Sequence, residues 1–272
     1  MTVQPFTLLL ARHPVRIEID DGKLASEVRA LCEGFVVEHS DPWLTLHLTA
    51  SNDAHRSPSR AVALPDGSGG WVIEGPRSRG TLHRDRAWHA SARVADMMSV
   101  RQLLYLCLAL LLPDSGTLLL HADAVALDGV AYAFLGPSGS GKSTLAHWLV
   151  ERAGARPLSV DRTAVSAGSG VPVVVTVPRL LPDTASDSGP EEIPLAALVF
   201  PGAGPGVASR RLGALEANQR LLRSVIMPQG GGRSVTRAFE LAQRVLDRAV
   251  ATELLWELGT DVAGEVRRRS GA

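Results

Sequence analysis

The sequence has few of the features that would tie it to a membrane or to an oxidising compartment. Only two of its 272 residues are cysteines, Cys32 and Cys107, too few and too far apart for a disulfide framework or a zinc site. The longest apolar run, Leu103 to Leu112, has about half the length of a membrane-spanning helix. The first residues, MTVQPFTLLLARHPVR, lack the charged-then-apolar order of a signal peptide. We therefore expect a cytoplasmic protein with no membrane partner.

The chain also lacks an excess of charge of either sign, because its 28 basic residues balance 28 acidic ones. No overall field therefore draws it to nucleic acid. The arginines between Arg77 and Arg86, and those from Arg267 to Arg269, are explained by a solvated loop and by a helix C-terminus. Hydrophobic residues make up 45% of the chain, which is enough for a globular core. We predict no nucleic-acid partner, whereas assembly into a homo-oligomer stays open.

Residues 1–95 have a pattern that is typical of β-structure. Short runs of apolar, β-branched and aromatic residues alternate with turn signals such as Asp-Gly and Gly-Ser-Gly-Gly. The polar stretch from Asn52 to Arg60 is predicted to be a loop. We therefore predict a β-rich N-terminal domain over residues 1–95. Its expected strands are Phe6–Leu10, Val15–Ile19, Phe35–Glu38, Trp43–Thr49, Ala61–Leu64, Trp71–Ile73 and Trp88–Val94.

Residues 96–272 alternate between helical and strand patterns. Met97–Leu112 is apolar on all sides, which predicts a helix buried between layers. The expected strands are Thr117–His121, Val125–Leu127, Val130–Leu135, Pro157–Val160, Val171–Val177, Leu195–Phe200 and Ala251–Leu258. The other expected helices are Ser143–Ala153, Gly213–Ile226, Val235–Ala249 and Asp261–Arg269, the last capped by Thr260. This order predicts an α/β fold, with a sheet flanked by helices.

One motif in this second region has a specific chemistry. It matches the phosphate-binding pattern G-x-x-x-x-G-K-[S/T], and its residues are Gly136, Pro137, Ser138, Gly139, Ser140, Gly141, Lys142, Ser143 and Thr144. Glycines let consecutive backbone N–H groups point at phosphates, and the helix N-terminus adds partial positive charge. Lys142 would neutralise the phosphates, and the Ser143 hydroxyl would ligate Mg²⁺. Because a predicted strand precedes the motif and a predicted helix follows it, we predict a nucleotide-binding P-loop.

The common classes of P-loop protein are not indicated by the rest of the sequence. The Leu-Ser-Gly-Gly signature of transporter ATPases and the Asn-Lys-x-Asp motif of GTPases are both absent. An acidic residue, Asp161, follows Lys142 by 19 positions at the end of a predicted strand. There its carboxylate would hold Mg²⁺ or orient a nucleophile. A role in capping a turn is the alternative.

Residues 118 to 165 resemble the HPr kinase/phosphorylase superfamily, particularly its shorter HPr kinase-like branch. The resemblance rests on Leu120-His121-Ala-Asp-Ala-Val, the Asp128-Gly129 turn, the P-loop and Leu158-Ser-Val-Asp-Arg162, with His121 fifteen residues before Gly136. The family transfers a phosphoryl group from ATP to a serine hydroxyl of a protein. Members of the branch are implied in tailoring ribosomally made peptides. The resemblance therefore implies a P-loop kinase-like domain over residues 96–272, with ATP and Mg²⁺ as cofactors and a peptide or small protein as partner.

The resemblance also implies roles for individual residues. Gly136–Thr144 would hold ATP, with Lys142 and Ser143 at the phosphates and metal, and His121 would support catalysis unless it is a core histidine. Asp161 would be the second of a tandem aspartate pair, whose first member, usually the general base, is Val160 here. Asp161 itself or Asp123, two residues from His121, would then act as the base. Two other functions stay open: a small-molecule kinase, whose acceptor would bind the loop 178–194, and a regulatory nucleotide-binding module with little catalysis, which Val160 favours.

Overall fold

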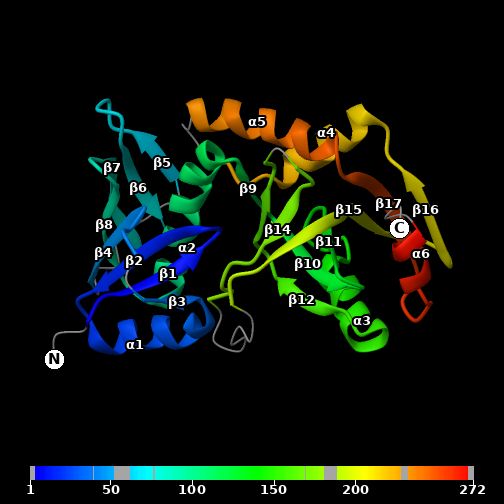
Figure 1. Cartoon of the computed structure of the whole chain (residues 1–272), viewed down its shortest axis with the longest axis horizontal. Helices are drawn as coiled ribbons and strands as arrows, with labels where there is room; N and C mark the ends of the chain where they lie inside the picture. The colour runs from blue at the N-terminus through cyan, green and yellow to red at the C-terminus, as the bar shows by residue number, and fades with distance from the viewer. Residues whose placement is uncertain are drawn as a thin grey trace. The chain divides into compact units, whose positions relative to one another are not determined.

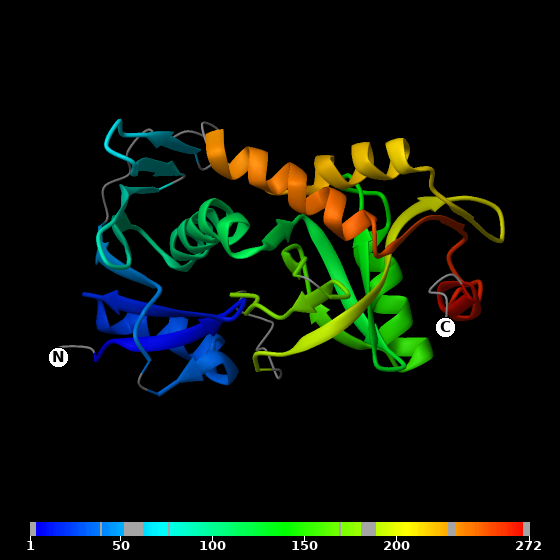
Figure 2. The same cartoon turned by 45° about the horizontal axis from the view of Figure 1, so that its top comes forward.

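The computed structural model describes residues 4–38, 40–51, 62–75, 77–168, 170–180, 189–227 and 232–268. Two mixed β-sheets and six α-helices are formed by these residues (Figures 1 and 2). The chain separates into two units. The first consists of Met1–Leu112, Pro178–Pro190 and Met227–Val235, and the second of Pro113–Val177, Glu191–Ile226 and Thr236–Ala272. The predicted α/β class is confirmed at this level.

The first unit contains an eight-stranded sheet with the strand order β3-β1-β2-β4-β8-β7-β6-β5. Side chains alternate between its two faces, as in β4, where Leu44, Leu46 and Leu48 are buried and His47 is exposed. Each predicted strand of this region has a counterpart, and the loop predicted from Asn52 to Arg60 lies outside the described residues. The strands are β1 (Phe6–Leu10), β2 (His13–Ile19), β3 (Val36–Val37), β4 (Leu44–Ala50), β5 (Val62–Pro65), β6 (Trp71–Gly75), β7 (Ser78–Arg84) and β8 (Trp88–Val94).

Two elements of this unit were not predicted. The helix α1 (Gly22–Leu31) begins at Asp21, whose carboxylate accepts a hydrogen bond from the Leu24 backbone N–H. Its apolar stripe is short, which hides the helical period in the sequence. The strand β7 places Gly80 on its inward side, where a Cβ atom would lie 2.2 Å from the Ser91 carbonyl oxygen. Because glycine is unfavourable inside strands, a strand that requires glycine at this position has only a weak β-pattern in its sequence.

The helix α2 (Met97–Leu111) has the buried position that its sequence predicts. Asp96 caps it by accepting a hydrogen bond from the Ser99 backbone N–H, and the helix lies next to β6, β7, β8 and α1. Within the described residues, the segment Met97–Ser115 is long and apolar enough to cross a membrane, but 72% of it is buried. Such burial is typical of a core helix in a soluble protein.

The second unit contains a nine-stranded sheet with the order β12-β10-β11-β15-β14-β13-β9, in which β17 also pairs with β15 and β16 pairs with β17. Its helices include α3 (Lys142–Ala153), which contacts β10 and β11, and α4 (Ala214–Ser224), which lies against β11 from the opposite face (Figures 1 and 2). Further helices are α5 (Gly232–Leu246), which belongs to this unit from Thr236 onward, and α6 (Ala263–Arg268). The strands are β9 (Thr117–Leu120), β10 (Ala122–Leu127), β11 (Val130–Leu135), β12 (Arg156–Ser159), β13 (Thr163–Ser166), β14 (Val173–Val175), β15 (Glu192–Ala203), β16 (Val207–Arg211) and β17 (Val250–Trp256).

Turns and caps in the second unit confirm one prediction and correct another. Asp128 and Gly129 join β10 to β11 with φ angles of 53° and 83°, as expected for an Asp-Gly hairpin turn. The predicted cap of α6 is wrong, because Asp261 accepts the hydrogen bond from the Ala263 backbone N–H. The Thr260 hydroxyl instead donates to the Glu257 carbonyl oxygen, since the helix starts two residues later than predicted.

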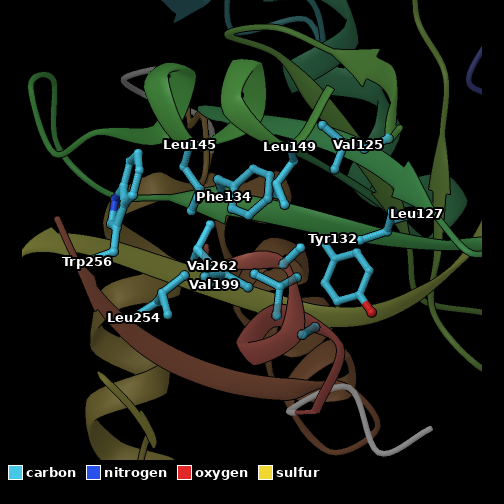
Figure 3. Close-up of a cluster of buried hydrophobic side chains, with 14 residues drawn as sticks. Val125, Leu127, Tyr132, Phe134, Leu145, Leu149, Val199, Leu254, Trp256 and Val262 are labelled. Atoms are coloured by element: carbon cyan, nitrogen blue, oxygen red, sulfur yellow. The ribbon is translucent and has the colours of Figure 1, made fainter. Parts of the chain in front are cut away.

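A buried apolar cluster fixes α3 on the sheet (Figure 3). Leu145 and Leu149 on α3 point toward Phe134 on β11, and all three side chains have no exposed surface. Val199 on β15 belongs to the same cluster. Because β11 and β15 are parallel, their carboxyl ends meet at one edge of the sheet. This packing holds the N-terminus of α3 at that edge, where the P-loop lies.

Candidate functional site

Gly136–Gly141 connect β11 to α3, and Lys142–Thr144 form the first residues of the helix, which is the context that the P-loop motif requires. Gly136 has a φ of 144°, and a Cβ atom there would lie 2.7 Å from the Ser140 hydroxyl oxygen. Gly141, the N-cap of α3, is left-handed with a φ of 91°, and no side chain caps the helix. The N–H groups of the first helical turn therefore remain available to an anion.

Lys142 folds back on the loop that precedes it. Its ammonium group donates hydrogen bonds to the carbonyl oxygens of Gly136, at 2.8 Å, and Pro137, at 3.0 Å. Only 7% of the residue is exposed. The ammonium group of Lys142 thus lies at the start of the loop. The terminal phosphates of a nucleotide would have to replace the two carbonyl oxygens as its hydrogen-bond partners.

Ser143 and Asp123 form the shortest polar contact at the loop. The Ser143 hydroxyl donates to Asp123 Oδ2 at 2.6 Å, and the Asp161 backbone N–H donates to Asp123 Oδ1 at 2.7 Å. Asp123 is 2% exposed and lies on β10 opposite Phe134 of β11. Two hydrogen bonds compensate the burial of its carboxylate. Because Ser143 donates its proton to Asp123, the lone pairs of its oxygen remain available to a cation.

Asp161 and His121 form a second polar pair. Asp161 follows β12 with a left-handed φ of 66°, and its Oδ1 lies 2.9 Å from His121 Nδ1 and 2.8 Å from Arg162 Nη1. His121 lies in the link between β9 and β10, and its backbone N–H donates to the Ser224 carbonyl oxygen. The imidazole is 40% exposed. The sequence placed Asp161 at the metal, but in the structure Asp123 contacts Ser143 and Asp161 contacts His121.

Both polar pairs border one cavity of about 310 Å³. Within the described residues no three histidine, cysteine, aspartate or glutamate side chains are grouped as a metal site. Mg²⁺ binds through one or two protein oxygens together with phosphates and water, so the Ser143 hydroxyl and the Asp123 carboxylate fit its needs. Val160 adds an apolar part to the wall. The cavity is lined by His121, Asp123, Ser138, Gly139, Gly141, Lys142, Ser143, Thr144, Val160 and Asp161.

Other polar residues of this region have structural partners. Glu191 forms an ion pair with Arg156 at 2.6 Å, and Glu192 begins β15, so the downstream pair of glutamates gives no ligand to the cavity. His147 on α3 pairs with Glu151 on the same helix. Arg162 was not singled out from the sequence, although its position directly after Asp161 was a signal that could have identified it.

His121 also lines a second cavity, of about 400 Å³, which sequence reasoning did not predict. Its residues come from four separate parts of the chain, so no local pattern marks them. They are His121, Leu135, Gly136, Pro137, Phe200, Pro201, Arg220, Arg223 and Ser224. The site therefore has a polar cavity beside the helix N-terminus and a more apolar one beside the start of the P-loop.

Comparisons with protein-family models and with curated proteins find no match for this chain. The resemblance to the HPr kinase superfamily therefore rests on the motifs between Leu118 and Val165 alone. The arrangement of the phosphate loop, the two polar pairs and the two cavities carries the functional argument.

Proposed function

We propose that this chain is an ATP- and Mg²⁺-dependent kinase that transfers the γ-phosphoryl group to a serine hydroxyl of a peptide or small protein. The observation that carries the proposal is the arrangement at one cavity of an uncapped helix N-terminus, a Ser143–Asp123 pair and a His121–Asp161 pair. A phosphate site alone requires only the first of these. The two polar pairs add a place for a cation and a group that can accept a proton.

The nucleotide half of the proposed site consists of the loop and the Ser143–Asp123 pair. Backbone N–H groups of Gly139 to Thr144 would bind the phosphates, and Lys142 would exchange its two carbonyl partners for phosphate oxygens. Mg²⁺, when bound, neutralises charge on the phosphates. Asp123 accepts the hydrogen bond of the Ser143 hydroxyl, so the serine oxygen could serve as a ligand of Mg²⁺.

The acceptor half of the proposed site depends on His121. His121 Nδ1 lies 2.9 Å from Asp161 Oδ1 and 3.2 Å from Arg162 Nη1. When Nδ1 donates its proton to the nearer group, the carboxylate, the lone pair of the neutral ring is on Nε2. Nε2 would accept the proton of the serine hydroxyl as the serine oxygen bonds to the γ-phosphorus. The bond from that phosphorus to the β-phosphate oxygen breaks, and ADP leaves. His121 would thus take the role that Val160 cannot perform.

The remaining features are assigned on the same basis. The second unit would be the HPr kinase-like P-loop kinase domain, which the sequence predicts over residues 96–272. The first unit, to which α2 belongs, would dock the substrate or mediate assembly. A cytoplasmic location supplies ATP and keeps thiols reduced, which suits the two buried free cysteines, Cys32 and Cys107. The proposed partner is the peptide substrate, without nucleic acid or membrane.

Val160 supports a second candidate function, a regulatory nucleotide-binding module with little catalysis. It occupies the cavity wall where the resembling family has a carboxylate, and it can neither accept a proton nor bind a cation. In this alternative the Asp161–His121 pair would only fix the turn after β12. The two candidates predict the same affinity for ATP and differ in phosphoryl transfer.

Transfer and binding should therefore be measured side by side. We would incubate the protein with γ-labelled ATP, Mg²⁺ and a mixture of serine peptides, and determine ATP affinity by calorimetry. We expect labelled peptide with the wild type, and a loss of about 10²- to 10⁴-fold in transfer for His121→Gln with ATP affinity unchanged. The matched control is His147→Gln, because His147 also pairs with an acidic residue but lies outside the cavity. ATP binding without labelled product from any serine peptide would refute the kinase and favour the regulatory module.

A further inference from the structure

The second cavity lies at the end of the P-loop where the transferred phosphoryl group would be. In P-loop proteins the lysine ammonium reaches the β- and γ-phosphates. Here Lys142 Nζ is bonded to the carbonyl oxygens of Gly136 and Pro137, and both of these residues line the second cavity. His121 lines both cavities. A hydroxyl in the second cavity would therefore lie next to the γ-phosphate and the proposed proton acceptor.

An apolar wall and a neutral ion network form one side of this cavity. Phe200 and Pro201 are buried at the C-terminal part of β15, and the Arg220 guanidinium stacks over the Phe200 ring at 5.8 Å from its centroid. Arg220 donates to Glu216, at 2.7 Å, and to Glu253, at 2.6 Å. Since Phe200 and Pro201 line the cavity, this wall can contact an apolar group of the acceptor.

The charge of Arg220 is already balanced. Arg210 also pairs with Glu216 and Glu253, so two guanidinium groups share two carboxylates. Hydrogen bonds from Arg210 lower the pKa of Glu216 to about 2, and hydrogen bonds from Arg220 lower the pKa of Glu253. Both carboxylates are therefore ionised at neutral pH, and the four groups sum to no net charge. Arg220 therefore forms part of the cavity wall and adds no net positive charge to the cavity.

Arg223 differs from its neighbour Arg220 in this respect. It lies in the last turn of α4, is exposed, and lines the cavity. Among the described residues it has no carboxylate partner. Since the nearby ion network is neutral, Arg223 gives this mouth of the cavity one uncompensated positive charge. A ligand with a negative group would be attracted to it.

We propose that this cavity is the acceptor site and that it selects a peptide whose serine is flanked by an apolar residue and an acidic residue. The apolar side chain would lie on Phe200 and Pro201, and the carboxylate would pair with Arg223. The serine hydroxyl would then point at His121 and the γ-phosphate. The inference rests on the proposed kinase function, and it adds to that function a rule for which serines are phosphorylated. A volume of about 400 Å³ accepts a few side chains of an extended segment, so recognition would be local.

Three peptides test this rule. In each of them a leucine flanks the serine, and the peptides differ only in the residue beside that leucine. They carry Glu, Gln or Lys at that position. With the wild type we expect the KM to rise about 3- to 10-fold from Glu to Gln and further to Lys, because one partly exposed ion pair is lost and then replaced by repulsion. Arg223→Glu should reverse this order, and Arg223→Gln should remove the preference.

Arg152→Glu is the matched control. Arg152 lies in the last turn of α3, so the substitution changes the same charge at the same helix position, but outside the cavity. It should leave the order of the three peptides unchanged. Circular dichroism would confirm that each variant is folded, and ATP affinity should be equal in all of them.

Binding of the same peptides with alanine in place of serine separates the two proposals. Fluorescence anisotropy should show the Glu > Gln > Lys order in the wild type and its reversal in Arg223→Glu. If this order is found but no serine peptide is phosphorylated, the kinase function is wrong and the acidic-peptide site stands. If the binding order is absent, or if it responds equally to Arg152→Glu, the assignment of the cavity is overturned, whatever the transfer result.

Discussion

If the proposed kinase function is correct, replacing Asp123 by asparagine should separate metal-dependent catalysis from nucleotide binding. The carboxylate accepts hydrogen bonds from the Ser143 hydroxyl at Oδ2 and from the Asp161 backbone at Oδ1. An asparagine oxygen can keep the second bond. Its NH₂ group then faces the serine oxygen and would donate to it, which occupies the lone pair that a cation needs. The substitution therefore changes the role of Ser143 while it preserves the shape of the site.

The size of the effect follows from the interactions that are lost. A hydrogen bond to a charged group contributes about 1.5–3 kcal/mol, which corresponds to roughly 10- to 150-fold in a rate or an affinity. Loss of a residue that orients a metal ligand typically costs about 10- to 100-fold. We expect kcat/KM for phosphoryl transfer to fall by about 10- to 100-fold and the Mg²⁺ concentration at half-maximal rate to rise.

The assay is a titration with Mg²⁺ at saturating ATP, followed by the amount of labelled peptide formed. Asp128→Asn is the matched control, because Asp128 lies in the turn that joins the same two strands and its side chain is 61% exposed. Asparagine tolerates the left-handed φ of 53° at that position. Identical Mg²⁺ curves for the two variants would refute the assignment of Asp123 to the cation.

Two further predictions concern the cores of the units. Phe134→Ala should lower the free energy of unfolding by about 3–5 kcal/mol, because a fully buried ring beneath α3 is removed. Urea denaturation measures this loss, and Phe239→Ala, which removes an exposed ring, is the control. Equal losses of unfolding free energy in the two variants would contradict the packing of α3. Burial raises the pKa of the Cys32 and Cys107 thiols to about 12, above their ordinary value of 9.0. The folded state holds these protons longer than the unfolded state, so this contribution to stability is complete below pH 9 and is lost as the pH rises toward 12. Denaturant midpoints measured across that range should fall less steeply for Cys107→Ala, and an unchanged slope would contradict the burial.

The parts of the fold that were predicted are those with a local period or a turn with its own chemistry. The strands of the first unit other than β7, the buried helix α2 and the Asp128–Gly129 hairpin each have such a signal. The strand β16 was not predicted, because Val207–Arg211 has few apolar residues and is defined by its pairing with β17. The order of strands within each sheet depends on contacts between residues that lie far apart in the sequence, and no local pattern predicts such contacts.

The same difference between local and long-range signals applies to the candidate site. The placement of the P-loop motif between a strand and a helix could be predicted, because consecutive residues suffice to specify the motif and both flanking elements. The partner of Ser143 could not, since Asp123 and Asp161 both end up near the loop and only the register of β10 against β11 decides which carboxylate reaches the hydroxyl. Arg223 lies 80 residues beyond Ser143 and has no motif of its own, although it would set the preference for the acceptor. The proposed nucleotide site is thus specified by consecutive residues, whereas the choice of acceptor would depend on long-range packing of α4 beside β11.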